Sequence, residues 1–453
     1  MADLRRLRVR HWFGARRTGI LIFVLVVVVH VVSPSPQTGD SRLSVVVAWQ
    51  LLTTGTIDLS GVASVDRLAW QGDLLSLPDG RLVPFFPWPP MLLALPGAIV
   101  LALTGTDPAA LSISDPNLTW IIEVPTASIL VAATAVVIRR LVLDAGRSWS
   151  TPRIGLLVAL AYAFTTIAWS AGSRALWQQT VSMLVIALTL LAAQRATRGG
   201  PWPWLIGVFG ALAFVMRPTN AVFVVAVLVW LLVRDRRAAL AALGGGGVVA
   251  LVFVASSWVL TGSPLPPYYL PTRLGEQPVY GLVESLGVHL ISPGRGLLLY
   301  VPVVLLAVAG VVLRLRRREF GGFELALVLA VLGQIVVIAR FGSTNGFTYG
   351  PRLLLDVVPL LMILAAPAFA AVARPRTVAA ALALVGVLVV LGWGLFVNAS
   401  GAVTRAAVCW NVTPTPIDVA PERVWDVADP PFLRPWTAVA AGEPFFVGSC
   451  SAD

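Results

Sequence analysis

The sequence contains no lysine, so all 33 of its basic residues are arginines. Charged residues of both signs make up only 12% of its 453 residues, against roughly 25% in soluble domains. The three histidines are isolated, and no pair has the spacing of metal ligands. Neither a soluble globular protein nor a histidine-based metalloenzyme is therefore expected.

Cysteine is also scarce. Cys409 and Cys450 are the only two, and both follow the last apolar run. Two cysteines in one external segment can form a disulfide in an oxidising compartment, or remain free thiols. Their spacing in the sequence fits both alternatives.

Long apolar runs dominate the remainder of the chain, which is 57% hydrophobic with a mean hydropathy of +0.85. Several runs reach the roughly 20 residues that a membrane-spanning helix requires. The net charge of +11 would suggest nucleic-acid binding in a soluble protein. Here the arginines lie in short loops between apolar runs, so the expected partner is the lipid bilayer and not nucleic acid.

The arginine clusters predict the topology, because basic loops are retained in the cytoplasm. The clusters are Arg5, Arg6, Arg8, Arg10, Arg16 and Arg17; Arg139 and Arg140; Arg195 and Arg198; Arg234, Arg236 and Arg237; Arg314, Arg316, Arg317 and Arg318; and Arg374 and Arg376.

We predict an all-α polytopic membrane protein with about eleven transmembrane helices, a cytoplasmic N-terminus and an external C-terminus. The predicted spans are 18–33, 119–138, 154–171, 177–194, 202–216, 219–233, 238–261, 296–313, 323–340, 353–373 and 377–397. The chain divides into a basic N-terminus (1–17), a membrane domain (18–397) and an extracytoplasmic tail (398–453). No small-x-small cleavage site directly follows the first run, because Ser33-Pro34-Ser35-Pro36 places prolines there, so we interpret the run as a retained span.

A long segment, 34–117, follows the first span and is predicted to form a first external loop. Its apolar pattern predicts an amphipathic helix over Ser41–Leu52, and Asp79-Gly80 predicts a hairpin turn. Residues 91–105 are ambiguous. A full crossing would place every later arginine cluster outside, whereas an interfacial helix kinked by prolines places them all inside. The second alternative is favoured.

Asp40 lies a few residues beyond the first span, in Gly39-Asp40-Ser41. A carboxylate at the membrane surface can accept a proton from an attacking sugar or lipid hydroxyl. Aspartate also favours the N-cap of a helix, and a helix is predicted directly after it. Both interpretations fit the position.

Three arginines, Arg217, Arg295 and Arg352, lie directly next to apolar runs on the predicted external side and so depart from the cytoplasmic bias. Arg174 is a fourth candidate. The planar guanidinium suits a phosphate in a bidentate contact, so an anionic ligand is one interpretation. Snorkelling to the lipid headgroups is the other, most plainly for Arg217 between two short spans.

Several further residues are candidates for a substrate groove. Glu123, in the outer third of a span, either pairs with an external arginine or contacts a substrate. Tyr268 and Tyr269 either stack on a sugar or anchor the chain at the interface. Gln178 and Tyr349 stand in the same blocks as Arg174 and Arg352. Gly244–Gly247 lacks the Lys-Ser/Thr of a phosphate loop and is predicted to allow close helix packing.

This layout resembles the C-type (GT-C) membrane glycosyltransferases, in particular bacterial relatives of protein O-mannosyltransferases. The resemblance rests on Gly39-Asp40-Ser41, Phe86-Pro87-Trp88-Pro89-Pro90, Ser173–Trp177, Arg217-Pro218-Thr219, Ser292–Gly296, Tyr349–Arg352 and the tail around Val424-Trp425-Asp426 and Pro431–Arg434. Many members have a second acidic residue that the motifs here lack, so the sequence does not support a divalent metal site, and no cofactor is expected.

The resemblance implies an inverting, envelope-building enzyme of the bacterial inner membrane. It would transfer a sugar from a polyprenyl phosphate to a glycan, lipid or protein acceptor on the extracytoplasmic face. Asp40 would be the general base, and the four arginines would bind the donor phosphate. The alternative is a transporter or flippase of a lipid-linked sugar, which uses the same arginines without chemistry. Transporters often contain internal repeats, and none is found here.

Overall fold

The structure is a computed structural model of the whole chain. It describes residues 2–37, 39–62, 65, 73–110, 119–196, 200–270, 279–343, 346–373, 377–440, 442, 445 and 450. Arg198, Arg374 and Arg376 of the predicted cytoplasmic clusters lie outside the described residues.

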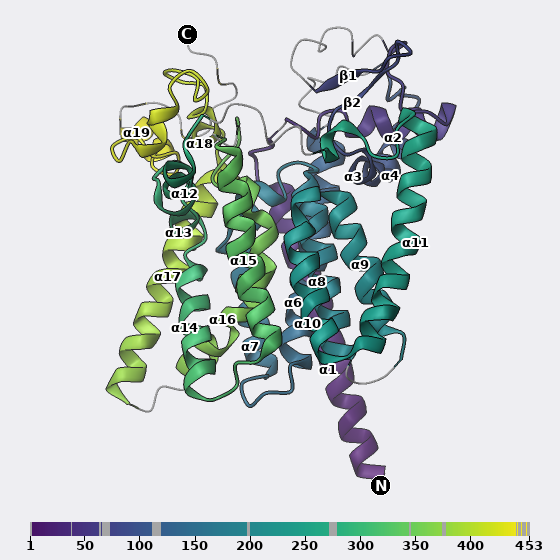
Figure 1. The fold of residues 1–453 in the computed structure, drawn as a ribbon. Helices are drawn as coiled ribbons and strands as arrows, with labels where there is room; N and C mark the ends of the chain where they lie inside the picture. Colours follow the sequence, from purple (N-terminus) through teal and green to yellow (C-terminus); the bar gives the residue numbers. More distant parts are fainter. Residues whose placement is uncertain are drawn as a thin grey trace.

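Long helices that run side by side form a bundle (Figure 1). They are α1 (Ala2–Val32), α6 (Val124–Asp144), α7 (Pro152–Phe164), α8 (Gln178–Arg195), α9 (Trp202–Met216), α10 (Ala221–Arg234), α11 (Arg236–Thr261), α14 (Val303–Arg316), α15 (Gly322–Phe341), α16 (Val358–Val372) and α17 (Val378–Val403). Each overlaps a predicted span, although several begin or end some residues away from the predicted bounds, most clearly at the start of α1 and the end of α7.

Among the described residues, five helices are long and apolar enough to cross a membrane by length and composition: Trp120–Asp144, Arg236–Thr261, Gly322–Phe341, Arg352–Val372 and Val378–Val403. The protein is therefore a largely helical membrane protein. The full number of eleven spans and their orientation stay predictions.

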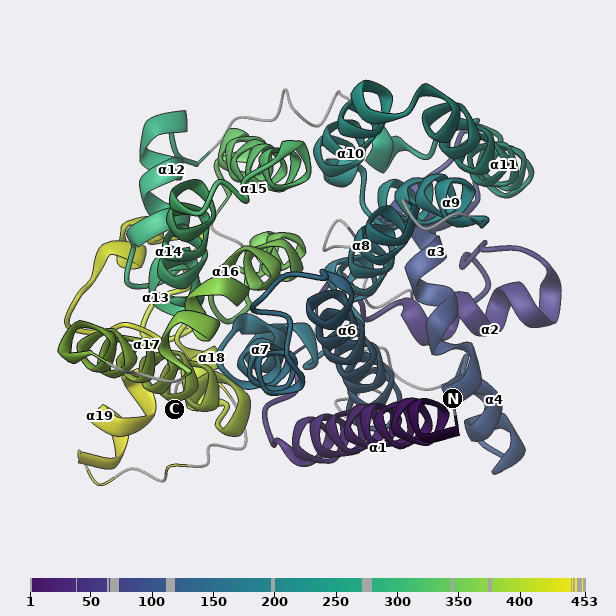
Figure 2. The same cartoon turned by 90° about the horizontal axis from the view of Figure 1, so that it is seen from below.

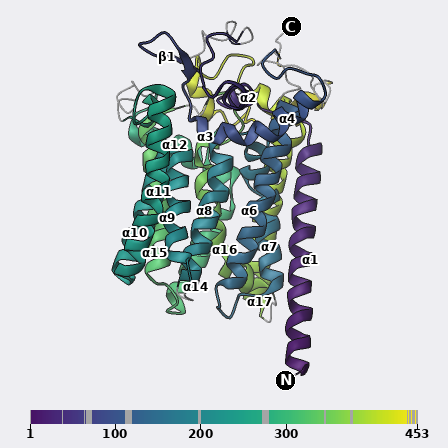
Figure 3. The same cartoon turned by 90° about the vertical axis from the view of Figure 1, so that its right-hand side faces the viewer.

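Short elements cover one end of the bundle, which we call the cap end (Figure 1). They include α2 (Ser44–Thr54), β1 (Leu74–Ser76), β2 (Leu82–Pro84), α3 (Trp88–Met91), η2 (Leu92–Ala94), α4 (Leu95–Leu103), η7 (Pro267–Tyr269), α12 (Leu282–Ile291), α13 (Leu297–Tyr300), α18 (Ala406–Cys409), η10 (Pro421–Trp425) and α19 (Arg434–Ala440). The chain's N-terminus lies at the opposite end, where α1 extends past the other helices (Figure 3).

The first loop folds as the sequence predicts. Strands β1 and β2 pair antiparallel about the Asp79-Gly80 turn, with Gly80 at φ +88°. The ambiguous segment 91–105 forms η2 and α4 at the cap end and does not cross the bundle. The apolar side of the amphipathic stretch is fully buried in a hydrophobic cluster, through Leu43, Val46 and Val47. The same cluster includes Val215 of α9 and Phe253 of α11.

Central and peripheral helices differ in their surroundings. Seen along the helix axes, α16 lies among α7, α14 and α15, and nearly all of its residues are buried (Figure 2). Helix α17 exposes most of its apolar window, as expected for a lipid-facing helix.

Glycine fixes one close contact in the bundle. A Cβ atom on Gly207 of α9 would lie 1.7 Å from the carbonyl oxygen of Ala242 in α11. A Cβ atom on Gly245 of α11 would lie 2.2 Å from the carbonyl oxygen of Trp204 in α9. The predicted role of Gly244–Gly247 in close helix packing is thus confirmed at Gly245.

One predicted boundary is wrong. The span predicted to begin at residue 296 contains a break, because Pro302 cannot donate a helical hydrogen bond. The four-residue helix α13 ends at Tyr300, and α14 begins at Val303. Arg295 consequently lies in a turn at the cap end and not at the start of a long helix.

Candidate active site

Asp40 and Arg352 form an ion pair at the cap end of the bundle. The Asp40 Oδ2 and Arg352 Nη1 atoms are 3.0 Å apart, and the Asp40 side chain is 24% exposed whereas that of Arg352 is 6% exposed. Asp40 comes from the turn between α1 and α2, and Arg352 begins η9 (Arg352–Val357). Two of the sequence candidates, 312 residues apart, therefore meet, and solvent reaches the carboxylate.

The helix-cap interpretation of Asp40 is wrong. Helix α2 begins at Ser44, its N-cap is Leu43, and no side chain caps it. The predicted amphipathic helix starts three residues late because Asp40 lies in a turn that directs its carboxylate to Arg352. Asp40 is thus available for chemistry.

Trp177 forms a platform beneath the Arg352 guanidinium. The Arg352 Cζ lies 4.1 Å from the Trp177 ring centroid, a cation–π contact. The indole Nε1 donates to the Ala171 carbonyl at 2.9 Å, which fixes the ring. A Cβ on Gly39 would lie 3.3 Å from the same ring, so the glycine lets the Asp40 segment pass close to it.

Arg352 retains donor capacity. Its Nε atom is buried and makes no hydrogen bond with any described residue. Gln178, the first residue of α8 and next to Trp177, is 5% exposed, and neither of its amide atoms has a hydrogen-bond partner in the described part of the chain. Buried polar atoms are nearly always paired, so these atoms indicate a place for a polar ligand or water.

Arg174, a predicted phosphate ligand, instead fixes the end of α1. Its side chain is fully buried and donates to the carbonyls of His30 and Ser33, the latter at 2.6 Å. Its own carbonyl accepts from the Gln37 amide at 2.9 Å. These contacts hold the chain three residues before Asp40.

Gln37 adds a second constraint on the same segment. Its amide nitrogen donates to the Ser170 carbonyl at 2.7 Å, and its amide oxygen accepts from the Tyr349 amide at 3.2 Å. One side chain therefore links the Asp40 segment to the turn that precedes Arg352. The two partners of the ion pair are positioned together.

Arg217 anchors the helix that carries Arg352. Its Nη1 donates to the Asp356 carboxylate and, at 2.8 Å, to the Leu353 carbonyl. Both Arg217 and Asp356 are almost fully buried. Asp356 lies four residues after Arg352, so this pair acts on the position of Arg352. Sequence reasoning missed Asp356, although a carboxylate in an apolar span usually has a charged partner.

Arg295 likewise forms its hydrogen bonds with other residues of the protein. It is fully buried and donates to the Asn411 side chain and, at 3.0 Å, to the Gly346 carbonyl. Its Cζ lies 5.2 Å from the Trp410 ring centroid. Burial lowers the pKa of Arg295 to about 10, and the nearby Arg352 charge acts in the same direction. Arg295 therefore links the C-terminal tail to the 346–352 turn.

A second carboxylate, Asp73, lies near Asp40 and was not among the sequence candidates. Its Oδ2 is 2.8 Å from the Arg42 Nε. Burial raises the pKa of Asp73, the Arg42 charge lowers it, and the neighbouring Asp40 raises it further. Asp73 precedes β1 and is far from any motif, so only the folded loop brings it to Asp40.

The groove candidates are distributed around this pair. The Glu123 carboxylate is buried and accepts from the Leu176 amide at 2.9 Å, next to Trp177. Tyr349 is fully buried, and its hydroxyl donates to the Val397 carbonyl at 2.6 Å. Tyr269 donates to the Val215 carbonyl, and Tyr268 packs against Phe85 and Phe86. Glu123, Gln178 and Tyr349 thus adjoin the elements of the pair, whereas the two tyrosines at 268–269 join the first loop to α9.

The tail after α17 also packs at the cap end. Cys409 and Cys450 form a disulfide. A small buried hydrophobic cluster joins the tail to α12 and to the chain just before it. It consists of Trp410, Ile417 and Val424 of the tail, Tyr280, and Val288 of α12. Among the described residues, no three histidine, cysteine, aspartate or glutamate side chains lie together in a way that could hold a metal ion.

Removing the Trp177 platform should weaken the site without abolishing it. In Trp177→Leu, Arg352 loses a cation–π contact of about 1–2 kcal/mol, so any activity of this site should fall about five- to thirtyfold. Trp177→Phe keeps a ring face and should retain most activity. The measurement is the turnover rate of variants with equal melting temperatures, and equal rates for the leucine and phenylalanine variants would contradict the platform role.

Comparison with known proteins gives one family match. Residues 120–259 match the family model described as dolichyl-phosphate-mannose-protein mannosyltransferase. This match confirms the resemblance to the C-type glycosyltransferases over the stretch that contains Arg174, Trp177 and Arg217; Asp40 and Arg352 lie outside it. No curated protein matches the chain.

Solved structures to which the chain is similar include the following two. One is ArnT from Cupriavidus metallidurans in the apo state, which is 16% identical, with 88% of this chain and 69% of that chain covered and a TM-score of 0.49. The other is the Archaeoglobus fulgidus oligosaccharyltransferase in the apo form, 12% identical, with a TM-score of 0.48. Its alignment covers 92% of this chain but only 60% of the archaeal chain.

Proposed function

We propose that the protein is a glycosyltransferase that uses a sugar linked to a polyprenyl phosphate and works at the cap end of the bundle. The observation that carries the proposal is the Asp40–Arg352 ion pair on the Trp177 platform. A carboxylate that solvent can reach can act as the general base, and a guanidinium beside it can stabilise the charge on a departing phosphate.

The proposed reaction is a direct displacement with inversion. Asp40 accepts the proton of an acceptor hydroxyl as its oxygen attacks the anomeric carbon. The bond between that carbon and the phosphate oxygen breaks, and the electron pair leaves on the lipid phosphate. Because the acceptor attacks and the phosphate leaves on opposite faces of the anomeric carbon, the sugar enters between Asp40 and Arg352 and separates the ion pair. The Arg352 guanidinium then stabilises the charge that develops on the phosphate, with its Nη1 and with the Nε that has no hydrogen-bond partner among the described residues.

The other three arginines take positioning roles in this proposal. Arg174 fixes the Asp40 segment, Arg217 fixes η9, and Arg295 fixes the 346–352 turn. Their donors contact carbonyl, amide and carboxylate oxygens, so Arg352 is the arginine assigned to the donor phosphate. Glu123 and Gln178 then line the acceptor side next to Trp177.

The family match supports a lipid-phosphate donor, because the family is described by a sugar on a polyprenyl-type phosphate. The arginine clusters support an orientation with the cap end outside. The bacterial inner membrane is proposed from the resemblance to bacterial members of the superfamily. No cofactor is required, because Asp40 and Arg352 supply the base and the cation. The acceptor is a hydroxyl of a glycan, lipid or protein.

The test is transfer of radiolabelled sugar from a polyprenyl-phosphate donor by the full chain in detergent. The proposal expects label in the acceptor and inverted configuration at the anomeric carbon. A transporter of the same lipid would move the donor across a vesicle membrane and leave the sugar on its phosphate. Donor movement without transfer would therefore reject the enzyme and support the transporter.

A further inference from the structure

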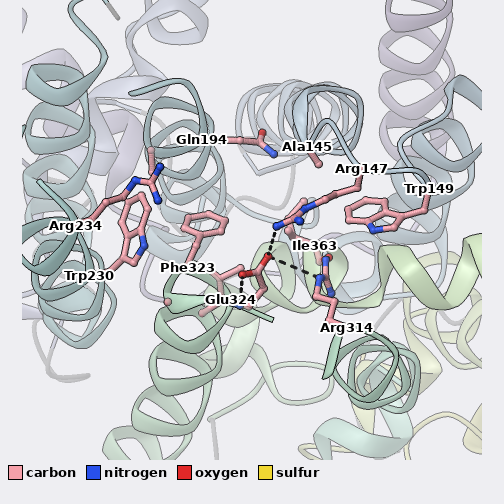
Figure 4. A pocket seen from close by; sticks show the side chains of 14 residues that line it. Ala145, Arg147, Trp149, Gln194, Trp230, Arg234, Arg314, Phe323, Glu324 and Ile363 are labelled. Atoms are coloured by element: carbon pink, nitrogen blue, oxygen red, sulfur yellow. Dashed lines mark hydrogen bonds and ion pairs between the residues drawn. The ribbon is translucent and has the colours of Figure 1, made fainter. Parts of the chain in front are cut away.

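A cavity lined by charged and aromatic side chains lies at the end of the bundle opposite to the cap end, and Figure 4 shows the side chains around it. It has a volume of about 260 Å³ and is bounded by the turn after α6, the ends of α8, α10 and α14, and the start of α15. Arg234 and Trp230 lie on one side of it, and Arg147 and Trp149 lie on the other. This end carries the predicted cytoplasmic arginine clusters.

The cavity carries an excess of positive charge. Three arginines, Arg147, Arg234 and Arg314, line it with one acidic residue, Glu324. Arg314 is engaged by protein groups, because it donates to the carbonyls of Ile363 and Leu364 at 2.8 and 2.7 Å. Glu324 accepts from the Gly321 amide at 3.0 Å and so caps α15.

Arg147 and Arg234 retain capacity for a ligand. Arg147 Nη2 is 4.0 Å from the Glu324 carboxylate, and its side chain is 42% exposed. Arg234 contacts the Trp230 ring at 6.0 Å and makes no ion pair with any described residue. The cavity's one lining carboxylate among the described residues, Glu324, lies near Arg147 and, at 3.9 Å, near the Arg314 Nε, and has no contact with Arg234. Three guanidinium groups with one carboxylate leave positive charge in the cavity, which favours an anion there.

An apolar groove continues from this cavity along the lipid-facing surface. It has a volume of about 860 Å³, lies between α10 and α15, and shares Trp230, Arg234 and Gly322 with the cavity. Three valines of α10 line the groove with more than half of their surface exposed: Val225 (58%), Val229 (54%) and Val233 (85%). The cavity and the groove are therefore polar at the helix ends and apolar toward the middle of the bundle.

We propose that this cavity and groove bind one membrane phospholipid of net negative charge in the cytoplasmic leaflet. The phosphate lies between Arg147 and Arg234, and an acyl chain lies in the groove against α10 and α15. Charge complementarity selects the anionic headgroup. The adjoining groove selects a lipid over a soluble anion, because only a lipid also covers the exposed valines.

Lipid titration of the purified full chain, followed by native mass spectrometry, tests the proposal. The probe is phosphatidylglycerol, compared with phosphatidylcholine and with free glycerol phosphate. Arg234→Gln and Arg147→Gln should each raise the Kd of phosphatidylglycerol about tenfold, which corresponds to about 1.4 kcal/mol. Arg236→Gln is the matched control, since Arg236 is exposed at the same end but does not line the cavity.

The groove is tested separately by Val229→Trp, which fills it. This variant should weaken phosphatidylglycerol binding, whereas Val308→Trp, at a 58% exposed valine of α14, should not. Phosphatidylcholine or glycerol phosphate binding as tightly as phosphatidylglycerol would overturn the proposal. So would an equal loss in Arg236→Gln, which would indicate only general surface charge. Each readout is independent of sugar transfer.

Discussion

Asp40→Asn should lower sugar transfer about a hundred- to ten-thousand-fold, the usual contribution of a general base. Asparagine has the size of aspartate and can still accept a hydrogen bond, but its amide cannot take the proton of the acceptor hydroxyl. Donor binding should change little, because Arg352 remains in place. The measurement is the initial rate of label transfer at saturating donor.

Asp107→Asn is the matched control for this variant. Asp107 is an exposed acid of the same first loop, and its carboxylate accepts a local hydrogen bond from the Ala109 amide. It should leave transfer unchanged. Full activity of Asp40→Asn, in a protein with the melting temperature of the wild type, would remove Asp40 from the chemistry.

Arg352→Gln is the second large prediction. It removes both the cation beside Asp40 and the donor assigned to the leaving phosphate, so kcat/KM should fall about a hundred- to a thousandfold. The loss should appear in kcat as well as in KM, because the charge on the phosphate grows as the bond to the sugar breaks. Steady-state kinetics over a range of donor concentrations give both constants.

Two further variants separate the functions of Arg352. Arg352→Lys keeps the charge but loses the planar fork and much of the contact with Trp177, so it should recover part of the rate. Arg340→Gln, at an exposed arginine near the cap end of α15, should have no effect. A lysine variant as inactive as the glutamine variant would show that a positive charge at this position is not sufficient and that the guanidinium geometry is required.

The helices could be placed from sequence because lipid imposes simple rules on the chain. Apolar stretches separated by arginine clusters located α6, α11 and α15 to within a few residues of their ends. The Asp79-Gly80 hairpin was also predictable from turn chemistry. The non-crossing of segment 91–105 was predictable from the later arginine clusters, which a full crossing would have placed outside. Pro302 was overlooked because the residues around it are uniformly apolar.

The partners of the candidate residues could not be predicted in the same way. The sequence around an arginine in an external turn does not distinguish an arginine that binds a ligand from one that donates to a protein carbonyl. Arg174 and Arg217 took protein partners, His30 and Asp356 among them, that lie far away in the sequence. The second carboxylate, Asp73, and the platform, Trp177, depend equally on tertiary contacts.

The most direct test of the central claim is an experimental structure of the protein with a polyprenyl-phosphate analogue bound. The account predicts the phosphate within hydrogen-bond distance of Arg352 at the cap end, with Asp40 beside the position of the anomeric carbon. A phosphate bound elsewhere, with the Asp40–Arg352 pair closed and remote from it, would contradict the account.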